Sequence, residues 1–183
     1  MWTFIKSADK IDSWLDSDKE EFAFWGRSNV GKSSLLNSLA NRSIAKVSST
    51  PGRTRLINYF ETPNNKIIVD LPGYGYAKMS NKEQEQISEM IANYLQNRVQ
   101  LKSIFVLIDS RHGVTPIDSE MIDLCFTLGL KVNIIVTKID KSNQSALHKA
   151  RTDMKNLYSG IDVYYVSAKT KKGLNKIQEN FEF

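Results

Sequence analysis

The sequence predicts a three-layer α/β/α domain with a mostly parallel, six-stranded sheet that has one antiparallel edge strand. Segments typical of strands and of helices alternate along the chain, and several of the strand-like segments are almost continuously apolar. Such a run is typical of a strand whose two faces are both covered by helices. A hairpin signal between two neighbouring strand-like segments predicts the antiparallel strand.

Apolar spacing and turn signals give the order of the elements. The TPNN turn, residues 62–65, joins two strands as a hairpin. Ser80 with Glu83, and Thr115 with Asp118, have the spacing of capping boxes, so each pair is expected to begin a helix. Strands are expected over residues 21–25, 55–61, 66–70, 103–109, 131–137 and 162–167, and helices over 32–41, after 80, after 115, over 142–158 and from about 174 to 181.

Length and composition indicate one globular domain. The chain has 183 residues, of which 41% are hydrophobic and 25% charged. A single cysteine, Cys125, excludes an internal disulfide framework and a multi-cysteine zinc site. The first 21 residues carry six acids and do not resemble a secretory signal, and no apolar run reaches the ~20 residues that span a bilayer. We therefore expect a cytoplasmic protein without membrane contact, with an N-terminal extension (1–21) and a main domain (22–183).

The charge is unevenly distributed. The formal net charge is +5, and residues 22–60 carry six basic side chains and no acid. One interpretation is binding to a polyanion such as RNA. The other is a solvated surface in which a few basic residues serve a bound phosphate, and the charge pattern alone leaves both open.

The junction between the first strand and the first helix carries the strongest motif. Residues 26–33 read GRSNVGKS, which fits the phosphate-binding loop G-x-x-x-x-G-K-S. Its glycines let backbone N–H groups turn inward around a phosphate, and the helix N-terminus adds its dipole. Lys32 is expected to reach the β- and γ-phosphates, and the Ser33 hydroxyl to ligate Mg²⁺. The expected nucleotide contacts here are Gly26, Arg27, Ser28, Asn29, Val30, Gly31, Lys32, Ser33 and Ser34.

A second motif, Asp70-Leu71-Pro72-Gly73, follows the strand over residues 66–70. A carboxylate at a strand end can hold Mg²⁺, and the Gly73 N–H can meet the γ-phosphate. Asp70 taken alone would be an ordinary turn residue. The phosphate loop favours the metal role, because a Mg²⁺–phosphate site needs an acid at a strand end.

Two further strand ends carry residues suited to reading a base. The Asp140 carboxylate in Thr137-Lys138-Ile139-Asp140 can accept two hydrogen bonds from guanine, whereas adenine offers neither donor. The aliphatic stem of Lys138 can lie on the base plane. The segment Val166-Ser167-Ala168-Lys169 ends the last strand, and its backbone N–H groups can meet guanine O6.

Together these motifs resemble the GTP-binding domains of translation-factor-like P-loop GTPases, and more closely one family. The strings GRSNVGKSSLLNSL, TPGRTRLINYF, DLPGYGYAK and DSRHG are similar to the EngB (YsxC/YihA) family of small bacterial GTPases, within the TrmE-Era-EngA-EngB-like group. The resemblance covers residues 22–181. It implies a GTPase that assists assembly of the large ribosomal subunit from its precursor, through rRNA or ribosomal proteins, in a family also linked to cell division and septation. We expect the chain to act as a monomer.

The resemblance also assigns residues in the first switch loop. The family's magnesium-binding threonine matches Thr54 rather than Thr50, and Gly52, Arg53, Arg55 and Leu56 flank it. The catalytic residues implied are Lys32, Thr54 and Gly73, and the Mg²⁺ ligands are Ser33, Thr54 and Asp70. The family's last motif reads S-S-x, whereas this chain has Ser167-Ala168-Lys169, a mild departure because the backbone makes the contact.

One residue type is missing from the catalytic pattern. A Ras-like enzyme places a glutamine after the DxxG motif to orient water, and this chain has Tyr74. Slow intrinsic hydrolysis is expected, completed by a partner or a cation. Related GTPases that have an asparagine at this position of the phosphate loop use K⁺ where others use an arginine finger, and Asn29 occupies that position. Asn29 can instead stabilise the loop by local hydrogen bonds. Tyr74 and Tyr76 can contact RNA or a protein, or pack the loop against the domain.

Two other functions share part of this pattern. A small-molecule P-loop kinase would need neither Asp140 nor its TKID context, and the sequence shows no lid insertion. A non-catalytic, nucleotide-gated module that binds RNA or protein shares every binding motif, and only turnover separates it from a GTPase switch.

Overall fold

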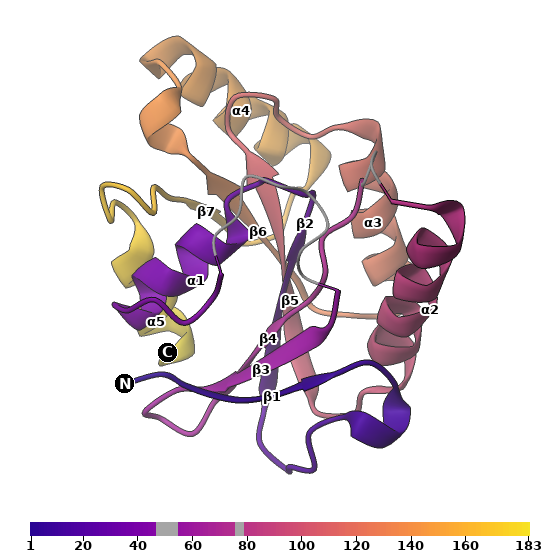
Figure 1. The fold of residues 1–183 in the computed structure, drawn as a ribbon. Coiled ribbons are helices and arrows are strands. Elements are labelled where there is room, and N and C mark those ends of the chain that lie inside the picture. Colours follow the sequence, from indigo (N-terminus) through magenta and orange to yellow (C-terminus); the bar gives the residue numbers. More distant parts are fainter. Residues whose placement is uncertain (47–54, 76–78) are drawn as a thin grey trace.

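The structure, a computed structural model, describes residues 1–46, 55–75 and 79–183. One seven-stranded sheet with the order β1-β3-β4-β2-β5-β6-β7 lies between two layers of helices (Figure 1). The strands are β1 (Thr3–Ala8), β2 (Glu21–Gly26), β3 (Ile57–Glu61), β4 (Ile67–Asp70), β5 (Leu101–Asp109), β6 (Val132–Thr137) and β7 (Val163–Tyr165). The helices are α1 (Lys32–Ala40), α2 (Asn81–Asn97), α3 (Pro116–Thr127), α4 (Gln144–Leu157) and α5 (Leu174–Phe181), with short 3₁₀ turns at Ile11–Ser13 and Ile139–Lys141.

The three-layer fold is therefore confirmed, with one strand more than the six expected. Antiparallel pairing is confined to one edge of the sheet, where β3 pairs with both β4 and β1, and all other neighbours are parallel. β3, expected at the edge, is covered by β1. This extra strand comes from the stretch 1–21.

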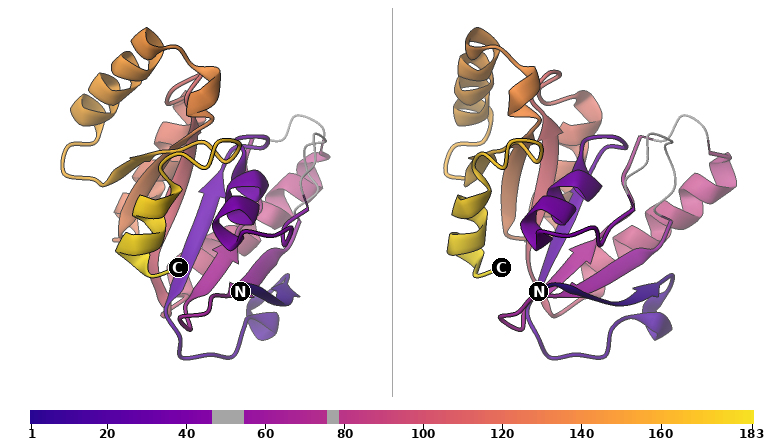
Figure 2. Two further views of the ribbon diagram at one scale, coloured as in Figure 1. Left: turned by 90° about the vertical axis from the view of Figure 1, so that its left-hand side faces the viewer. Right: turned by 60° about the vertical axis from the view of Figure 1, so that its left-hand side comes forward.

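The two faces of the sheet bury separate cores. On one face, α1 and α5 cover a cluster that includes stacked Phe24 and Phe105, whose ring centroids are 4.7 Å apart. On the other face, α2, α3 and α4 cover a cluster centred on the alternate residues of the same strands. Figure 2 shows α1 and α5 together on their side of the sheet. Complete burial on both faces explains why the central strands are apolar throughout.

Both predicted capping boxes are present. The Ser80 hydroxyl accepts a hydrogen bond from the Glu83 amide, and the Glu83 carboxylate accepts one from the Ser80 amide. Thr115 and Asp118 make the same pair of bonds, with Pro116 at the first helical position. These local signals fix where α2 and α3 begin.

The fold brings the predicted motifs to one edge of the sheet. β2, β4, β5 and β6 run parallel and end at Gly26, Asp70, Asp109 and Thr137. In open α/β sheets, ligands bind outside the carboxyl ends of the strands. The phosphate loop, the DxxG segment and the TKID segment all leave the sheet at this edge.

Candidate nucleotide-binding site

The loop between β2 and α1 has the backbone that a phosphate cradle requires. Asn29 and Gly31 have φ values of 64° and 102°, in the left-handed region that lets successive N–H groups turn to one side. Space is tight as well. A Cβ on Gly26 would lie 3.0 Å from Val30 Cγ1 and 3.1 Å from Leu107 Cβ, and one on Gly31 would lie 3.3 Å from Lys138 Cε. Both glycines are therefore needed.

Lys32 and Asp70 meet at the start of α1. The Lys32 ammonium donates to the Asp70 carboxylate, and the two residues are only 8% and 2% exposed. β2 and β4 are neighbours, so their carboxyl ends bring the two motifs together. The pair places the residue expected to bind phosphate beside the carboxylate expected to hold Mg²⁺.

The donor set at this point suits magnesium. Ser33 is the second residue of α1, directly after Lys32, and its hydroxyl and the Asp70 carboxylate are hard oxygen ligands of the kind that Mg²⁺ takes. Within residues 1–46, 55–75 and 79–183, no group of three or more His, Cys, Asp or Glu side chains forms a protein-only metal cluster.

The segment after β4 is tied to the phosphate loop. The Trp25 indole donates to the Pro72 carbonyl at 3.0 Å, and the Tyr74 amide donates to the Gly26 carbonyl at 3.1 Å. The Ser28 amide in turn donates to the Tyr74 carbonyl at 3.0 Å. Gly73 is thus held beside the loop. The buried Ser28 hydroxyl has no hydrogen-bond partner among the described residues, which leaves a donor for a phosphate oxygen.

A cavity of about 180 Å³ lies next to the loop, at the ends of β6 and β7. It brings together the two segments that were expected to read the base and part of the loop that was expected to hold the phosphates. Leu35 and Lys141 also line it and were not predicted. The lining residues are Gly31, Ser34, Leu35, Thr137, Lys138, Asp140, Lys141, Val166, Ala168 and Lys169.

Asp140 is oriented at this cavity by the last strand segment. The Ser167 hydroxyl donates to Asp140 Oδ1 at 2.7 Å, and this hydrogen bond lowers the pKa of the carboxyl group. The carboxylate is ionised at neutral pH and can accept hydrogen bonds from a base. The Ser38 hydroxyl donates to the Ala168 carbonyl at 2.8 Å and fixes the same segment to α1.

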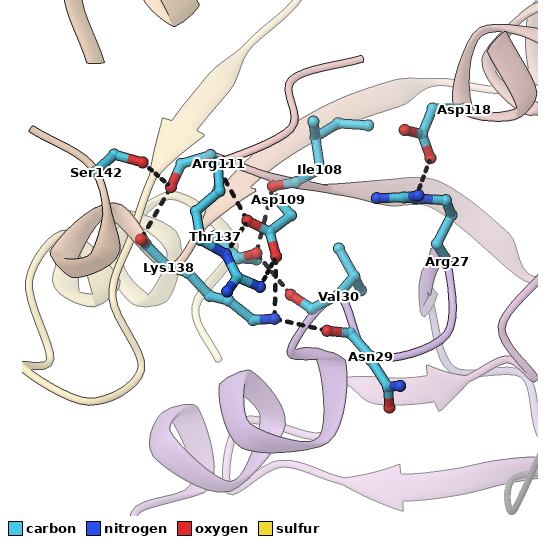
Figure 3. A network of polar contacts seen from close by, with 11 residues as sticks. Arg27, Asn29, Val30, Ile108, Asp109, Arg111, Asp118, Thr137, Lys138 and Ser142 are labelled. Carbon is cyan, nitrogen blue, oxygen red and sulfur yellow. Dashed lines mark hydrogen bonds and ion pairs between the residues drawn. The ribbon is translucent and has the colours of Figure 1, made fainter. Parts of the chain in front are cut away.

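Lys138 and Thr137 connect the base cavity to the phosphate loop. Lys138 Nζ donates to the Asn29 carbonyl at 2.6 Å, and Thr137 Oγ1 donates to the Val30 carbonyl at 2.7 Å (Figure 3). Lys138 has a left-handed backbone, with φ of 57°. Its stem passes close to Gly31 of the loop and also lines the cavity.

Asp109 completes this network and was not assigned a role from the sequence. Its carboxylate accepts from Arg111 Nε at 3.0 Å and from Arg111 Nη2 at 2.8 Å, and lies 3.0 Å from Lys138 Nζ (Figure 3). Burial alone would raise the pKa of Asp109, but the hydrogen bonds from Arg111 and Lys138 hold it well below its ordinary value. The sequence did contain a signal for Asp109 as a site residue, because Asp109 ends an apolar strand just as Asp70 does.

Tyr74 packs inward in this structure. Its ring lies 5.1 Å from that of Trp25, and its hydroxyl donates to Asp118 Oδ1 at 2.8 Å. Burial, then the Asp118 charge, raises the pKa of Tyr74 far above its ordinary value. Asp118, 1% exposed, also lies 3.8 Å from Arg27 Nε, so it joins the phosphate loop, the DxxG segment and α3. Sequence reasoning saw Asp118 only as a helix cap.

The first switch loop is described only at its end. Gly52, Arg53 and Thr54 lie outside the described residues, as do Thr50 and Tyr76, so the structure does not place the expected magnesium-binding threonine. Arg55 and Leu56 are exposed, and Arg55 Nη1 donates to Glu83 Oε1 of α2 at 2.9 Å. The Asn29 side chain is exposed and points away from the Lys138 network (Figure 3).

The fold and this site define a class, the P-loop GTPases. Solved structures agree with the fold. Aquifex aeolicus Era bound to GDP and aluminium fluoride matches with a TM-score of 0.74 and 24% identity, over 88% of this chain and 55% of that chain. A crystal structure of a probable GTP-binding protein EngB matches with a TM-score of 0.71 and 24% identity, over 88% of this chain and 96% of that chain.

Sequence comparisons narrow the class to a family. A family model described as 50S ribosome-binding GTPase matches residues 21–138. A probable GTP-binding protein EngB of Metamycoplasma arthritidis is 54% identical over 182 residues, with 100% of both chains covered. Its counterpart in Mycoplasmopsis synoviae is 46% identical, over 98% of this chain and 97% of that one. The chain belongs to the EngB family of GTP-binding proteins, which are GTPases.

Proposed function

We propose that this protein is a GTP-driven switch that assists assembly of the large ribosomal subunit in the cytoplasm, acting as a monomer. The proposal of guanine-nucleotide binding is supported by the cavity beside the phosphate loop, which is lined by Asp140, Lys138 and the Ala168 segment. The ribosomal part rests on the family model, whose own description is a 50S ribosome-binding GTPase. Within the described residues, no helix is long and apolar enough to cross a membrane.

In this proposal each group at the strand ends has one task. Lys32 and the loop N–H groups bind the phosphates, Ser33 and Asp70 hold Mg²⁺ together with Thr54, and the ion neutralises phosphate charge. The Gly73 N–H meets the γ-phosphate, so that loss of this phosphate releases the segment that follows. Lys32 must then exchange its carboxylate partner for phosphate when GTP binds.

We also propose that hydrolysis by the isolated protein is slow. The position after the DxxG motif holds Tyr74, which is buried against Trp25 and supplies no group to orient water. A partner or a cation must complete the site. K⁺ is the candidate cation, since Asn29 projects an unengaged amide from the loop and its side chain makes no loop-stabilising hydrogen bond within the described chain.

Phosphate release from GTP tests the catalytic part. We expect slow release in Mg²⁺ and Na⁺, and release at least about tenfold faster when K⁺ replaces Na⁺. Asn29→Gly should abolish the K⁺ effect and leave GDP affinity nearly unchanged, because glycine keeps the left-handed backbone of the loop and Asn29 meets Lys138 only through its backbone carbonyl. Equal rates in the two salts would refute the K⁺ proposal. No turnover under any condition would favour the non-catalytic module.

Co-sedimentation tests the ribosomal part. The protein loaded with a non-hydrolysable GTP analogue should sediment with large-subunit precursor particles, and the GDP form should not. If neither the GTP-analogue form nor the GDP form bound the precursor particles, the proposed partner would be contradicted. Membership in a GTPase family already leaves the small-molecule kinase alternative without support.

A further inference from the structure

A second and larger hollow lies away from the nucleotide site. Its volume is about 770 Å³, and most of its lining residues come from the segment around the 3₁₀ turn Ile11–Ser13, which follows β1, and from α2. Figure 1 shows the ribbons of this turn and of α2. Of the described residues that line it, none belongs to the phosphate loop or the base cavity, and Arg55 comes from the end of the first switch loop. We call it the α2 groove. Its lining residues are Asp9, Lys10, Ile11, Asp12, Trp14, Arg55, Met79, Glu83, Gln86, Ile87, Glu89, Met90 and Asn93.

The charge of the α2 groove is opposite to that of the whole protein. Four carboxylates and two basic groups line it, although the chain has a net charge of +5. Arg55 is already paired with Glu83 at 2.9 Å. Asp12 and Glu89 are exposed and have no ion-pair partner among the described residues. A negatively charged hollow on a basic protein repels RNA and nucleotides and attracts cationic groups.

The groove also offers apolar surface. Ile11 is 51% exposed at its rim, and half-buried Trp14 and Met79 line it together with Ile87 and Met90. The indole N–H of Trp14 has no hydrogen-bond partner in the described part of the chain. Apolar anchors surrounded by charged groups are typical of protein-binding surfaces.

The rim of the groove is built before any partner arrives. Ser13 Oγ accepts from the Asp9 amide at 3.1 Å and from the Lys10 amide at 3.2 Å, which fixes the turn. The Trp14 ring lies 5.8 Å from that of Tyr94 on α2. From Glu83 to Asn93 the helical rise gives a wall of about 15 Å, which matches about three turns of a docked helix. A preformed groove binds without the cost of ordering itself.

We infer that the α2 groove is a docking site for a protein segment that carries basic side chains and apolar anchors, such as an amphipathic basic helix. Lysines or arginines of the segment would meet Asp12 and Glu89, and its apolar residues would pack on Ile11 and Met90. This inference goes beyond the proposed function and does not require GTP binding, so its failure would leave the GTPase proposal intact.

A labelled peptide provides the first test. We would titrate the full chain, loaded with GDP and Mg²⁺, into a fluorescent leucine–lysine peptide of about 15 residues with helical amphipathic spacing. A matched leucine–glutamate peptide is the comparison. The lysine peptide should bind at least about tenfold more tightly at about 0.15 M salt. Equal binding of the two peptides would overturn the inference.

Charge-reversal variants locate the site. Asp12→Lys combined with Glu89→Lys should weaken binding of the lysine peptide about tenfold or more. Glu120→Lys combined with Glu179→Lys, on exposed positions of α3 and α5, makes the same change in net charge and should weaken binding less than about twofold. Equal losses in the two double variants would mean attraction to the whole molecule, and would overturn the assignment of the groove.

The apolar half of the inference has its own pair of variants. Ile11→Ser should weaken binding of the lysine peptide about fivefold, whereas Val99→Ser, 89% exposed and outside the groove, should leave it unchanged. Backbone amide NMR signals supply a readout that does not depend on substitutions. Peptide-induced shifts should concentrate in residues 9–14 and 83–93, and shifts concentrated elsewhere would overturn the inference.

Discussion

Single carboxylates at strand ends determine much of the chemistry of this molecule. Asp70, Asp109 and Asp140 each follow an apolar strand or end it, yet their partners differ. Asp70 is paired with Lys32, Asp109 with Arg111 and Lys138, and Asp140 with the Ser167 hydroxyl. Only Asp140 is left exposed, which suits a group that reads a base.

Asp109 gives a prediction about pH. Its pKa is lower in the folded protein than in the unfolded chain, where it is about 3.9. Its stabilisation is therefore fully present above about pH 4 and is lost as the pH falls toward the folded pKa. Asp109→Asn should lower the free energy of unfolding by about 2 kcal/mol at pH 7. The difference from wild type should shrink at about pH 3.

Urea unfolding at the two pH values measures the stability difference between Asp109→Asn and wild type at each pH. Asp153→Asn, at an exposed position of α4, is the control and should change stability by less than about 0.5 kcal/mol at either pH. A deficit in Asp109→Asn that is the same at both pH values would contradict the ion-pair explanation.

Contacts between elements explain which parts of the site could be predicted from the sequence. The phosphate loop, DxxG and TKID are contiguous strings, so their chemistry was visible before the fold. The anchoring contacts were not, because they join distant positions. Lys138 Nζ meets the Asn29 carbonyl across 109 positions, and the Tyr74 hydroxyl meets Asp118 across 44. No periodic pattern encodes such a pair.

Tyr74 tests the contact between the DxxG segment and α3. Tyr74→Phe keeps the ring on Trp25 but removes the hydroxyl that donates to buried Asp118. Stability should fall by about 1–2 kcal/mol, while GDP affinity stays within about twofold. Tyr165→Phe is the matched control, because the Tyr165 hydroxyl has no hydrogen-bond partner among the described residues, and its stability should stay within about 0.5 kcal/mol of wild type. Thermal unfolding gives the stabilities, and equal losses in the two variants would contradict the role of Asp118.

Boundaries of elements depart from the expected ones for similar reasons. The last strand was predicted over residues 162–167, and β7 covers Val163–Tyr165. The Val166 amide still donates to the Val136 carbonyl of β6 at 2.8 Å, and the chain then turns, with the Ser167 amide donating to the Lys172 carbonyl at 3.0 Å. The helix expected over 142–158 begins at Gln144, where Asn143 caps the Ala146 amide at 2.8 Å.

At the scale of the whole molecule, the N-terminal stretch was the main surprise. β1 was not predicted, because an edge strand is held by backbone hydrogen bonds to its neighbour, here β3, rather than by an apolar pattern of its own. Three of its six residues are exposed. The stretch is braced further by buried Glu21, whose carboxylate accepts from the Tyr94 hydroxyl at 2.7 Å and from Arg98 Nε at 3.0 Å. Arg98 Nη2 also donates to the Leu15 carbonyl at 2.7 Å.

Arg98 therefore joins the N-terminal stretch, β2 and α2, and its loss should be costly. Arg98→Ala leaves the Glu21 carboxylate, 0% exposed, without its ionic partner, and we expect a loss of about 3–5 kcal/mol. Lys102→Ala breaks only the exposed pair with Glu20, 3.5 Å apart, and should cost less than about 1 kcal/mol. Urea unfolding of the two variants measures both losses. A loss in Arg98→Ala as small as that expected for Lys102→Ala would show that the contacts of Arg98 with Glu21 and Leu15 are not needed for stability.

The measurement that tests guanine recognition most directly is calorimetric titration of wild type and Asp140→Asn, in Mg²⁺, with GDP, ADP and xanthosine diphosphate. Xanthine has a carbonyl where guanine has its amino group, so an asparagine amide can donate to it and the carboxylate cannot. We predict that wild type binds GDP at least about 100-fold more tightly than ADP, and that Asp140→Asn loses GDP and gains xanthosine diphosphate. Equal binding of ADP and GDP by wild type, or unchanged GDP binding by the variant, would contradict base reading by Asp140.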